Sequence, residues 1–67
     1  MNEKNTMIKK YLASLKSAAK QYNPDRKNTA FINAALRIAN NKYKINAAST
    51  TSEQDAWFSA LDIYFKS

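Results

Sequence analysis

Few residues of this chain could carry out catalysis. It contains no histidine and no cysteine, so neither an imidazole base nor a thiolate nucleophile is available. Glycine is also absent, which excludes a glycine-rich phosphate loop. The five acidic residues are scattered and do not form a convincing Mg²⁺ or Ca²⁺ ligand set. We therefore expect a protein that is not an enzyme, with no catalytic residue, no metal site and no cofactor.

Basic side chains are the residues whose spacing indicates a function. Eleven Lys and Arg stand against five Asp and Glu, for a formal net charge of +6. In the expected first helix, Lys9, Lys16 and Lys20 are seven and four residues apart. At about 100° per residue they fall nearly on one line. Such a basic ridge is typical of an ordinary solvated face and also of a surface that contacts phosphates.

Further polar candidates lie in the expected second helix and just before it. Arg26 and Lys27 precede its start, where phosphate-contacting residues often position a reading helix. Arginine and asparagine match the edges of guanine and adenine, although they also occur on inert surfaces. The predicted nucleic-acid-binding residues are Lys9, Lys16, Lys20, Arg26, Lys27, Asn33, Arg37 and Lys44.

Charge is divided unevenly along the chain. Residues 1–45 contain ten basic and two acidic residues, a net charge of +8. Residues 46–67 contain one basic and three acidic residues, a net charge of −2. The basic part and the acidic part would suit different partners.

Three helices must position these side chains. Without glycine and with Pro24 as the single proline, tight hairpin turns of the Asn-Gly kind cannot form. Apolar residues recur instead at the three- and four-residue spacing of amphipathic helices. The pattern predicts an all-α, compact three-helix bundle forming one domain over residues 1–67, with helices at about 6–22, 29–44 and 52–65. The predicted core is Ile8, Leu12, Leu15, Ala19, Phe31, Ile32, Leu36, Ala39, Trp57, Leu61 and Tyr64.

Local signals predict where these helices begin and end. The candidate N-caps are Asn5 or Thr6 for the first helix, Asn28 or Thr29 for the second, and Thr50 or Thr51 for the third. Thr50 with Glu53, and Thr51 with Gln54, match the capping-box spacing. Pro24 should stop the first helix, because the residue before a proline is pushed out of helical geometry.

The expected third helix has more aromatic residues than its own core needs. Four of them fall within nine positions, residues 57–65. Either Trp57, Leu61 and Tyr64 pack inward while Phe58 and Phe65 remain partly exposed, or a second chain buries the helix. The predicted protein-interface residues are Phe58, Asp62 and Phe65.

One segment of the third helix is similar to a known family. Residues 53–62, EQDAWFSALD, resemble the acidic-aromatic-Ser-Ala-x-Asp segment of the Hha/YmoA family. Residues 41–43, and Tyr11, Leu12 and Leu15 near the start, also look similar. The resemblance implies a small helical cytoplasmic regulator that docks on the nucleoid protein H-NS, with Asp62 as the partner-binding aspartate. The chain departs from the family in lacking its arginine-rich end of the first helix and its cysteine. It also has about ten extra residues between helices.

The sequence thus predicts a small basic, non-enzymatic regulatory protein. Its Lys/Arg surface on the first two helices would contact nucleic acid or an acidic protein. One alternative is an adaptor or inhibitor that binds a protein, such as a DNA-associated one, through the aromatic third helix. Another is a homodimer whose aromatic residues form a shared core. A helix-turn-helix fits poorly, because the linkers of about six and seven residues are long and the third helix is acidic.

The chain shows no sign of a membrane or export segment. No apolar run reaches the roughly 18 residues that a membrane span needs. Residues 1–5 are polar, and no apolar signal-peptide region follows them. We therefore expect no membrane partner and a cytoplasmic location.

Overall fold

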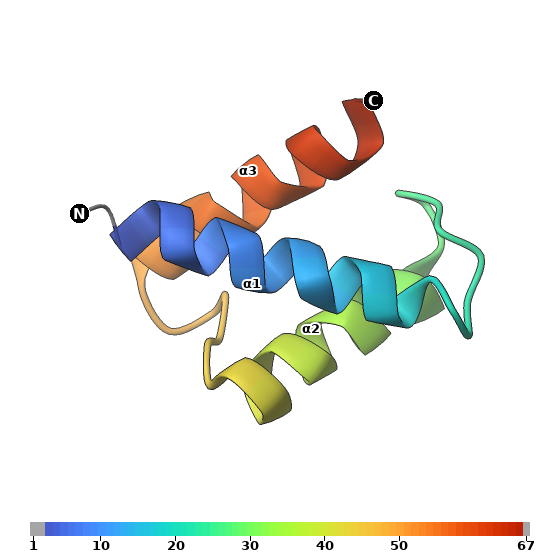
Figure 1. The fold of residues 1–67 in the computed structure, drawn as a ribbon, viewed down its shortest axis with the longest axis horizontal. Coiled ribbons are helices and arrows are strands. Elements are labelled where there is room, and N and C mark those ends of the chain that lie inside the picture. The colour runs from blue at the N-terminus through green and yellow to red at the C-terminus, as the bar shows by residue number, and fades with distance from the viewer. Residues whose placement is uncertain (1–2, 67) are drawn as a thin grey trace.

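Each helix of the chain buries one narrow stripe of residues. In a computed structural model, which describes residues 3–66, the helices are α1 (Glu3–Ala18), α2 (Thr29–Tyr43) and α3 (Thr51–Lys66), and these residues contain no strand (Figure 1). The predicted three-helix bundle is confirmed. The buried residues are Tyr11, Ser14, Leu15 and Ala18 of α1, Phe31, Ala35 and Ala39 of α2, and Ala56, Trp57, Ala60 and Leu61 of α3. The many small alanines in this set allow the helix backbones to approach one another closely.

Helix α1 lies between the other two helices (Figure 1). It packs against both α2 and α3, whereas no Cα atom of α2 comes within 8 Å of a Cα atom of α3. The two outer helices therefore approach each other through side chains and not through their backbones. Phe31, at the start of α2, meets Tyr64 and Phe65, near the end of α3, with ring centroids 6.2 and 6.1 Å apart.

Tyr11 is the centre of the α1–α3 contact. Its side chain is fully buried, and its ring meets the Trp57 ring edge-on at a centroid distance of 5.2 Å. Such an edge-to-face pair contributes roughly 0.5–1.5 kcal/mol beyond the area that it buries. The Tyr11 hydroxyl is buried with no hydrogen-bond partner among the described residues.

The predicted core is correct for only part of its residues. Leu15, Phe31, Ala39, Trp57 and Leu61 are buried as predicted. The other six predicted residues are half-buried around this core: Ile8, Leu12, Ala19, Ile32, Leu36 and Tyr64. The prediction also omitted buried residues, namely Tyr11, Ser14, Ala18, Ala35, Ile45, Ala56 and Ala60. Because α1 contacts two helices at once, the line between its two contact faces is the most buried, and Tyr11 and Ala18 lie on that line.

The prediction for the ends of the first helix was wrong. Helix α1 begins three residues earlier than expected and ends at Ala18, four residues before the predicted end at Tyr22. The chain turns after Ala18 through bonds of the i→i−3 kind, from Lys20 N–H to the Ser17 carbonyl and from Gln21 N–H to the Ala18 carbonyl. Tyr22 is 40% exposed. A further helical turn would therefore gain little stability from burial, and the helix ends well before Pro24.

Helix α2 matches its prediction to within one residue and is capped at both ends. The Asn28 side chain accepts a hydrogen bond from the Phe31 N–H and donates one to the Asn23 carbonyl. Lys44 follows the helix with left-handed backbone angles, φ 60° and ψ 34°. The next residue, Ile45, is buried and donates its N–H to the Ala39 carbonyl at 3.2 Å.

Helix α3, also within one residue of its prediction at each end, begins with the expected Thr50 cap, in which Glu53 bonds to the Thr50 hydroxyl rather than to the backbone N–H of a full capping box. The Thr50 hydroxyl oxygen accepts from the Glu53 N–H at 3.1 Å, and the hydroxyl donates to the Glu53 carboxylate at 3.0 Å. The second carboxylate oxygen accepts from the Asn46 N–H at 2.8 Å. Glu53 therefore anchors the α2–α3 loop as well as the helix start.

Lys44 occupies a backbone conformation that glycine adopts at lower cost. We expect Lys44→Gly to raise the free energy of unfolding by up to about 1 kcal/mol, because a left-handed residue with a Cβ is strained. Lys44→Ala removes the same charge and keeps the Cβ, so its stability should not rise. Urea unfolding followed by circular dichroism measures both variants, and equal stabilities would contradict the assignment.

Tyr11 should make stability depend on alkaline pH. Burial, followed by the nearby negative charge of Glu53, raises the pKa of Tyr11 from 10.0 to about 12. The unfolded chain loses this proton near pH 10 while the folded chain keeps it. The stability contributed by neutral Tyr11 is therefore complete below pH 10 and is lost as the pH rises to about 12.

Tyr11→Phe should remove the part of the stability loss above pH 10 that comes from ionisation of Tyr11. At neutral pH it should be neutral or slightly stabilising, because it deletes a buried hydroxyl without a partner. Urea unfolding at about pH 8 and about pH 11 tests this, with Tyr22→Phe as the same change at an exposed site. An alkaline loss as large in Tyr11→Phe as in the wild type would contradict the prediction.

Candidate nucleic-acid interface

The exposed side of α1 has two of the predicted lysines. On the helix, Lys9 and Lys16 lie about 150° around the axis from buried Tyr11, and both are exposed. Lys20, in the turn after α1, is also exposed. Among residues 3–66, none of these three lysine side chains forms an ion pair or a hydrogen bond. Their positive charges are therefore available to a ligand.

A groove joins the end of α1 to the middle of α2. Its cavity volume is about 380 Å³. The groove is lined by Ser17, Ala18, Lys20, Gln21, Tyr22, Ala34, Arg37 and Ile38. Two predicted residues, Lys20 and Arg37, thus share one groove although they are far apart in the sequence. Arg37 is exposed, and like Lys20 it has no ion pair within the described residues.

Arg26 has a partner inside the molecule. Its guanidinium donates to the Asp62 carboxylate at 2.8 Å and lies 5.6 Å from the centre of the Phe65 ring. Asp62 and Phe65 are two of the three predicted protein-interface residues. Arg26, predicted to contact phosphates, therefore lies instead against two residues of the predicted protein interface. This contact holds the α1–α2 linker against the end of α3.

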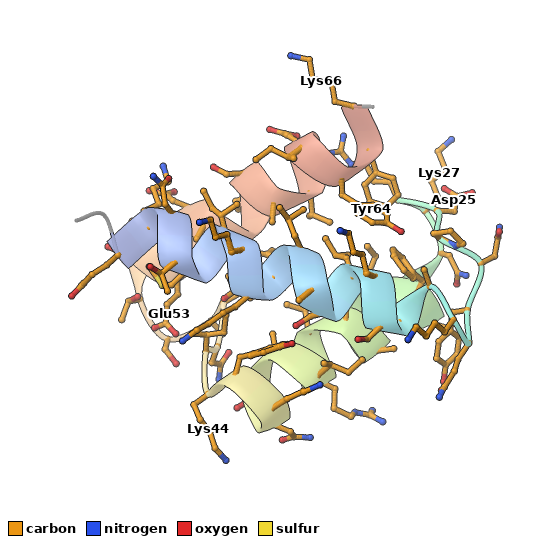
Figure 2. The ribbon with its side chains drawn as sticks, viewed as in Figure 1. Asp25, Lys27, Lys44, Glu53, Tyr64 and Lys66 are labelled. Atoms are coloured by element: carbon orange, nitrogen blue, oxygen red, sulfur yellow. The ribbon has the colours of Figure 1, made fainter. Side chains whose placement is uncertain are left out.

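The remaining predicted residues lie apart from one another. Lys27 and Lys44 are at opposite ends of α2 (Figure 2), a helix about 22 Å long. Asn33 is exposed on the same outer face of α2 as Arg37. The eight predicted residues thus do not form one patch. The ones that could act together are Lys9 and Lys16 along α1, and Lys20 and Arg37 across the groove.

Tyr22 is the residue of this groove that the sequence analysis missed. Its three-residue spacing from Ala19 fits the apolar pattern of the expected first helix, so the spacing alone does not mark Tyr22 as a ligand-binding residue. The signal that could have separated it is its position two residues before Pro24, where the helix was already expected to end.

Phe58, the third predicted interface residue, lies at a second hollow between α2 and α3. This hollow has a volume of about 480 Å³ and contains side chains of α2, the α2–α3 loop and α3. Phe58 is 54% exposed, beside Trp57, Leu36 and Arg37. The hollow exists because the backbones of the two outer helices do not meet.

Within residues 3–66, no helix combines the length and the apolar composition needed to cross a membrane. The same residues contain no group of three or more acidic, histidine or cysteine side chains able to hold a metal ion.

No protein-family model, curated protein or solved structure matches the chain. The similarity to the Hha/YmoA family therefore remains a similarity of short segments.

The Arg26–Asp62 contact should stabilise the fold only weakly. Both side chains are largely exposed, at 55% and 73%. A double-mutant cycle of Arg26→Gln and Asp62→Asn, measured by urea unfolding, should give a coupling of about 0.2–1 kcal/mol that shrinks at high salt. The control cycle of Arg37→Gln with Asp62→Asn should be additive, because these residues form no ion pair. A coupling that persists unchanged at high salt would contradict an exposed ion pair.

Proposed function

We propose that this chain is a small, non-enzymatic regulatory protein that binds nucleic acid through phosphate contacts of α1 and α2. The observation that carries the proposal is the set of exposed cations that have no acidic partner among residues 3–66: Lys9, Lys16, Lys20 and Arg37. Each can replace a counterion at a phosphate, and the release of that counterion supplies binding free energy.

The acidic residues do little to neutralise this surface. Three carboxylates accept hydrogen bonds within the chain: Asp25 from the Lys27 N–H, Glu53 from the α2–α3 loop, and Asp62 from Arg26. Glu3 is the only acidic residue of α1 and lies in its first turn. The middle and the end of α1 therefore keep their positive charge, which steers a polyanion toward this side of the molecule.

A phosphate-binding role fits the arrangement better than sequence reading by an inserted helix. The basic residues are spread over α1, the turn after it and the outer face of α2, so no single helix presents all of them. The third helix, which would read the major groove in a three-helix DNA-binding domain, is acidic and has a single cation, Lys66, in its last turn. Contacts of this kind position a protein on a backbone and carry little sequence information.

Phe58 supports a second proposal, a protein-binding role for α3. An exposed phenylalanine beside an apolar hollow is typical of an anchor residue at a protein interface. A second copy of the chain is one partner that could cover it. The mass in solution distinguishes a homodimer from a monomer that awaits another protein.

Replacing Lys9, Lys16 and Lys20 together by Gln should weaken binding to nucleic acid and reduce its salt dependence. The slope of log affinity against log salt should fall by up to about 3 on duplex DNA, at about 0.9 per lost phosphate contact, and by somewhat less on a single strand. The fold should persist, because all three side chains are exposed. Anisotropy titrations of labelled duplex and single-stranded oligonucleotides at several salt concentrations measure the slope.

Lys66→Gln is the matched control for a single charge. Lys66 ends the acidic helix α3, so its loss should leave the slope nearly unchanged, whereas Lys16→Gln should lower it by about 1. Equal effects of the two changes would indicate attraction by net charge alone. If the wild type binds neither oligonucleotide above background, the nucleic-acid proposal fails and the protein-binding role of α3 takes its place.

A further inference from the structure

Tyr22 has an unusual environment for an aromatic residue of this chain. Six of the eight aromatic residues contact another ring or a cation: Tyr11, Phe31, Tyr43, Trp57, Tyr64 and Phe65. Tyr22 and Phe58 have no such partner within the described residues. Tyr22 is 40% exposed and lies at the groove between the end of α1 and α2. Its ring is therefore accessible to a planar ligand.

The same groove offers an apolar surface and two free cations. Ala18, Ala34 and Ile38 supply apolar surface, while Lys20 and Arg37 come from α1's end and from α2. A ligand that is planar and apolar on its faces, and that also has a negative charge close by, would satisfy all of these groups. A nucleotide with its base turned out of the stack has this chemistry.

The backbone at the end of α1 does not oppose a phosphate as strongly as a bare helix C-terminus would. The Ala18 carbonyl accepts from both the Gln21 N–H, at 3.1 Å, and the Tyr22 N–H, at 2.9 Å. The Ser17 carbonyl accepts from the Lys20 N–H at 3.2 Å. These carbonyls already have donors, and Lys20 adds a positive charge at the helix end, where the macrodipole favours one.

We infer that this groove binds single-stranded nucleic acid, with one unstacked base against Tyr22 and the adjoining phosphate between Lys20 and Arg37. The inference rests on the proposed function and names its substrate class. A duplex keeps its bases stacked and paired, so it offers no base face to Tyr22. A single strand can turn a base out and stack it on an aromatic side chain without regard to sequence.

The test compares Tyr22→Leu with the wild type on three labelled ligands. These are an oligothymidine of about 12 nucleotides, within the usual range of single-strand site sizes, the same strand made of abasic nucleotides, and a duplex of equal length. Tyr22→Leu should weaken binding to oligothymidine by about tenfold. It should leave binding to the abasic strand and to the duplex unchanged, because neither presents a free base.

Matched variants separate stacking from general damage. Tyr22→Trp should restore tight binding to oligothymidine, whereas Phe58→Leu, at the other exposed aromatic residue, should bind like the wild type. Arg37→Gln should weaken binding to oligothymidine and to the abasic strand, because it removes the phosphate contact. Circular dichroism and thermal melting of each variant establish that it is folded, as expected for changes at exposed side chains.

The outcomes distinguish this inference from the proposed function. Suppose that Tyr22→Leu binds oligothymidine as tightly as the wild type, while the Lys9, Lys16 and Lys20 triple variant binds more weakly. The groove inference is then overturned and the proposed function stands. An equal loss on oligothymidine and on the abasic strand also overturns stacking on Tyr22. If the wild type binds no nucleic acid, the proposed function and the inference fail together.

Discussion

The burial of α1 on two sides is the constraint from which the rest of the structure follows. Tyr11 and Leu15 are fully covered because α2 and α3 both pack on this one helix. With α1 between them, the outer helices need not meet, and the chain is left with a hollow beside Phe58. The third side of α1 faces solvent, so its lysines stay exposed. A short chain thus obtains a core and an unobstructed charged face from the same helix.

The start of α2 and the end of α3, far from the loop that connects the two helices, are held together by side-chain contacts. Phe31 packs on Tyr64 and Phe65 there, and Arg26 lies over Phe65 while it pairs with Asp62. These contacts hold the α1–α2 linker on α3. The exposed ion pair adds little free energy by itself. Most of the stabilising free energy of this contact between α2 and α3 therefore comes from the packing of the aromatic rings. Asp62 and Phe65 are occupied by these contacts, which leaves Phe58 as the freer of the predicted interface residues.

Local signals in the sequence predicted much of the fold. Contacts between residues far apart in the sequence could not be predicted in this way. The Asn28 and Thr50 caps act within three residues, so α2 and α3 were placed to within one residue. Helix α1 ends without a strong signal of its own, at the point where burial stops. The Arg26–Asp62 pair spans 36 residues, and neither residue type nor spacing indicated it. The site was predicted as seven cations and one amide, but the groove that contains both Lys20 and Arg37 depends on how α1 packs against α2.

The arrangement separates the charged surface from the residues that hold the fold. Lys9, Lys16, Lys20 and Arg37 are all exposed and none pairs with a carboxylate of the described chain. A polyanion can therefore bind them without breaking an internal contact, and no refolding free energy is subtracted from the affinity. The core beneath depends on Tyr11, Leu15 and small alanines, which carry no charge at neutral pH. The positive face can thus change its charge, by mutation or by lysine modification, while the packing that positions it stays the same.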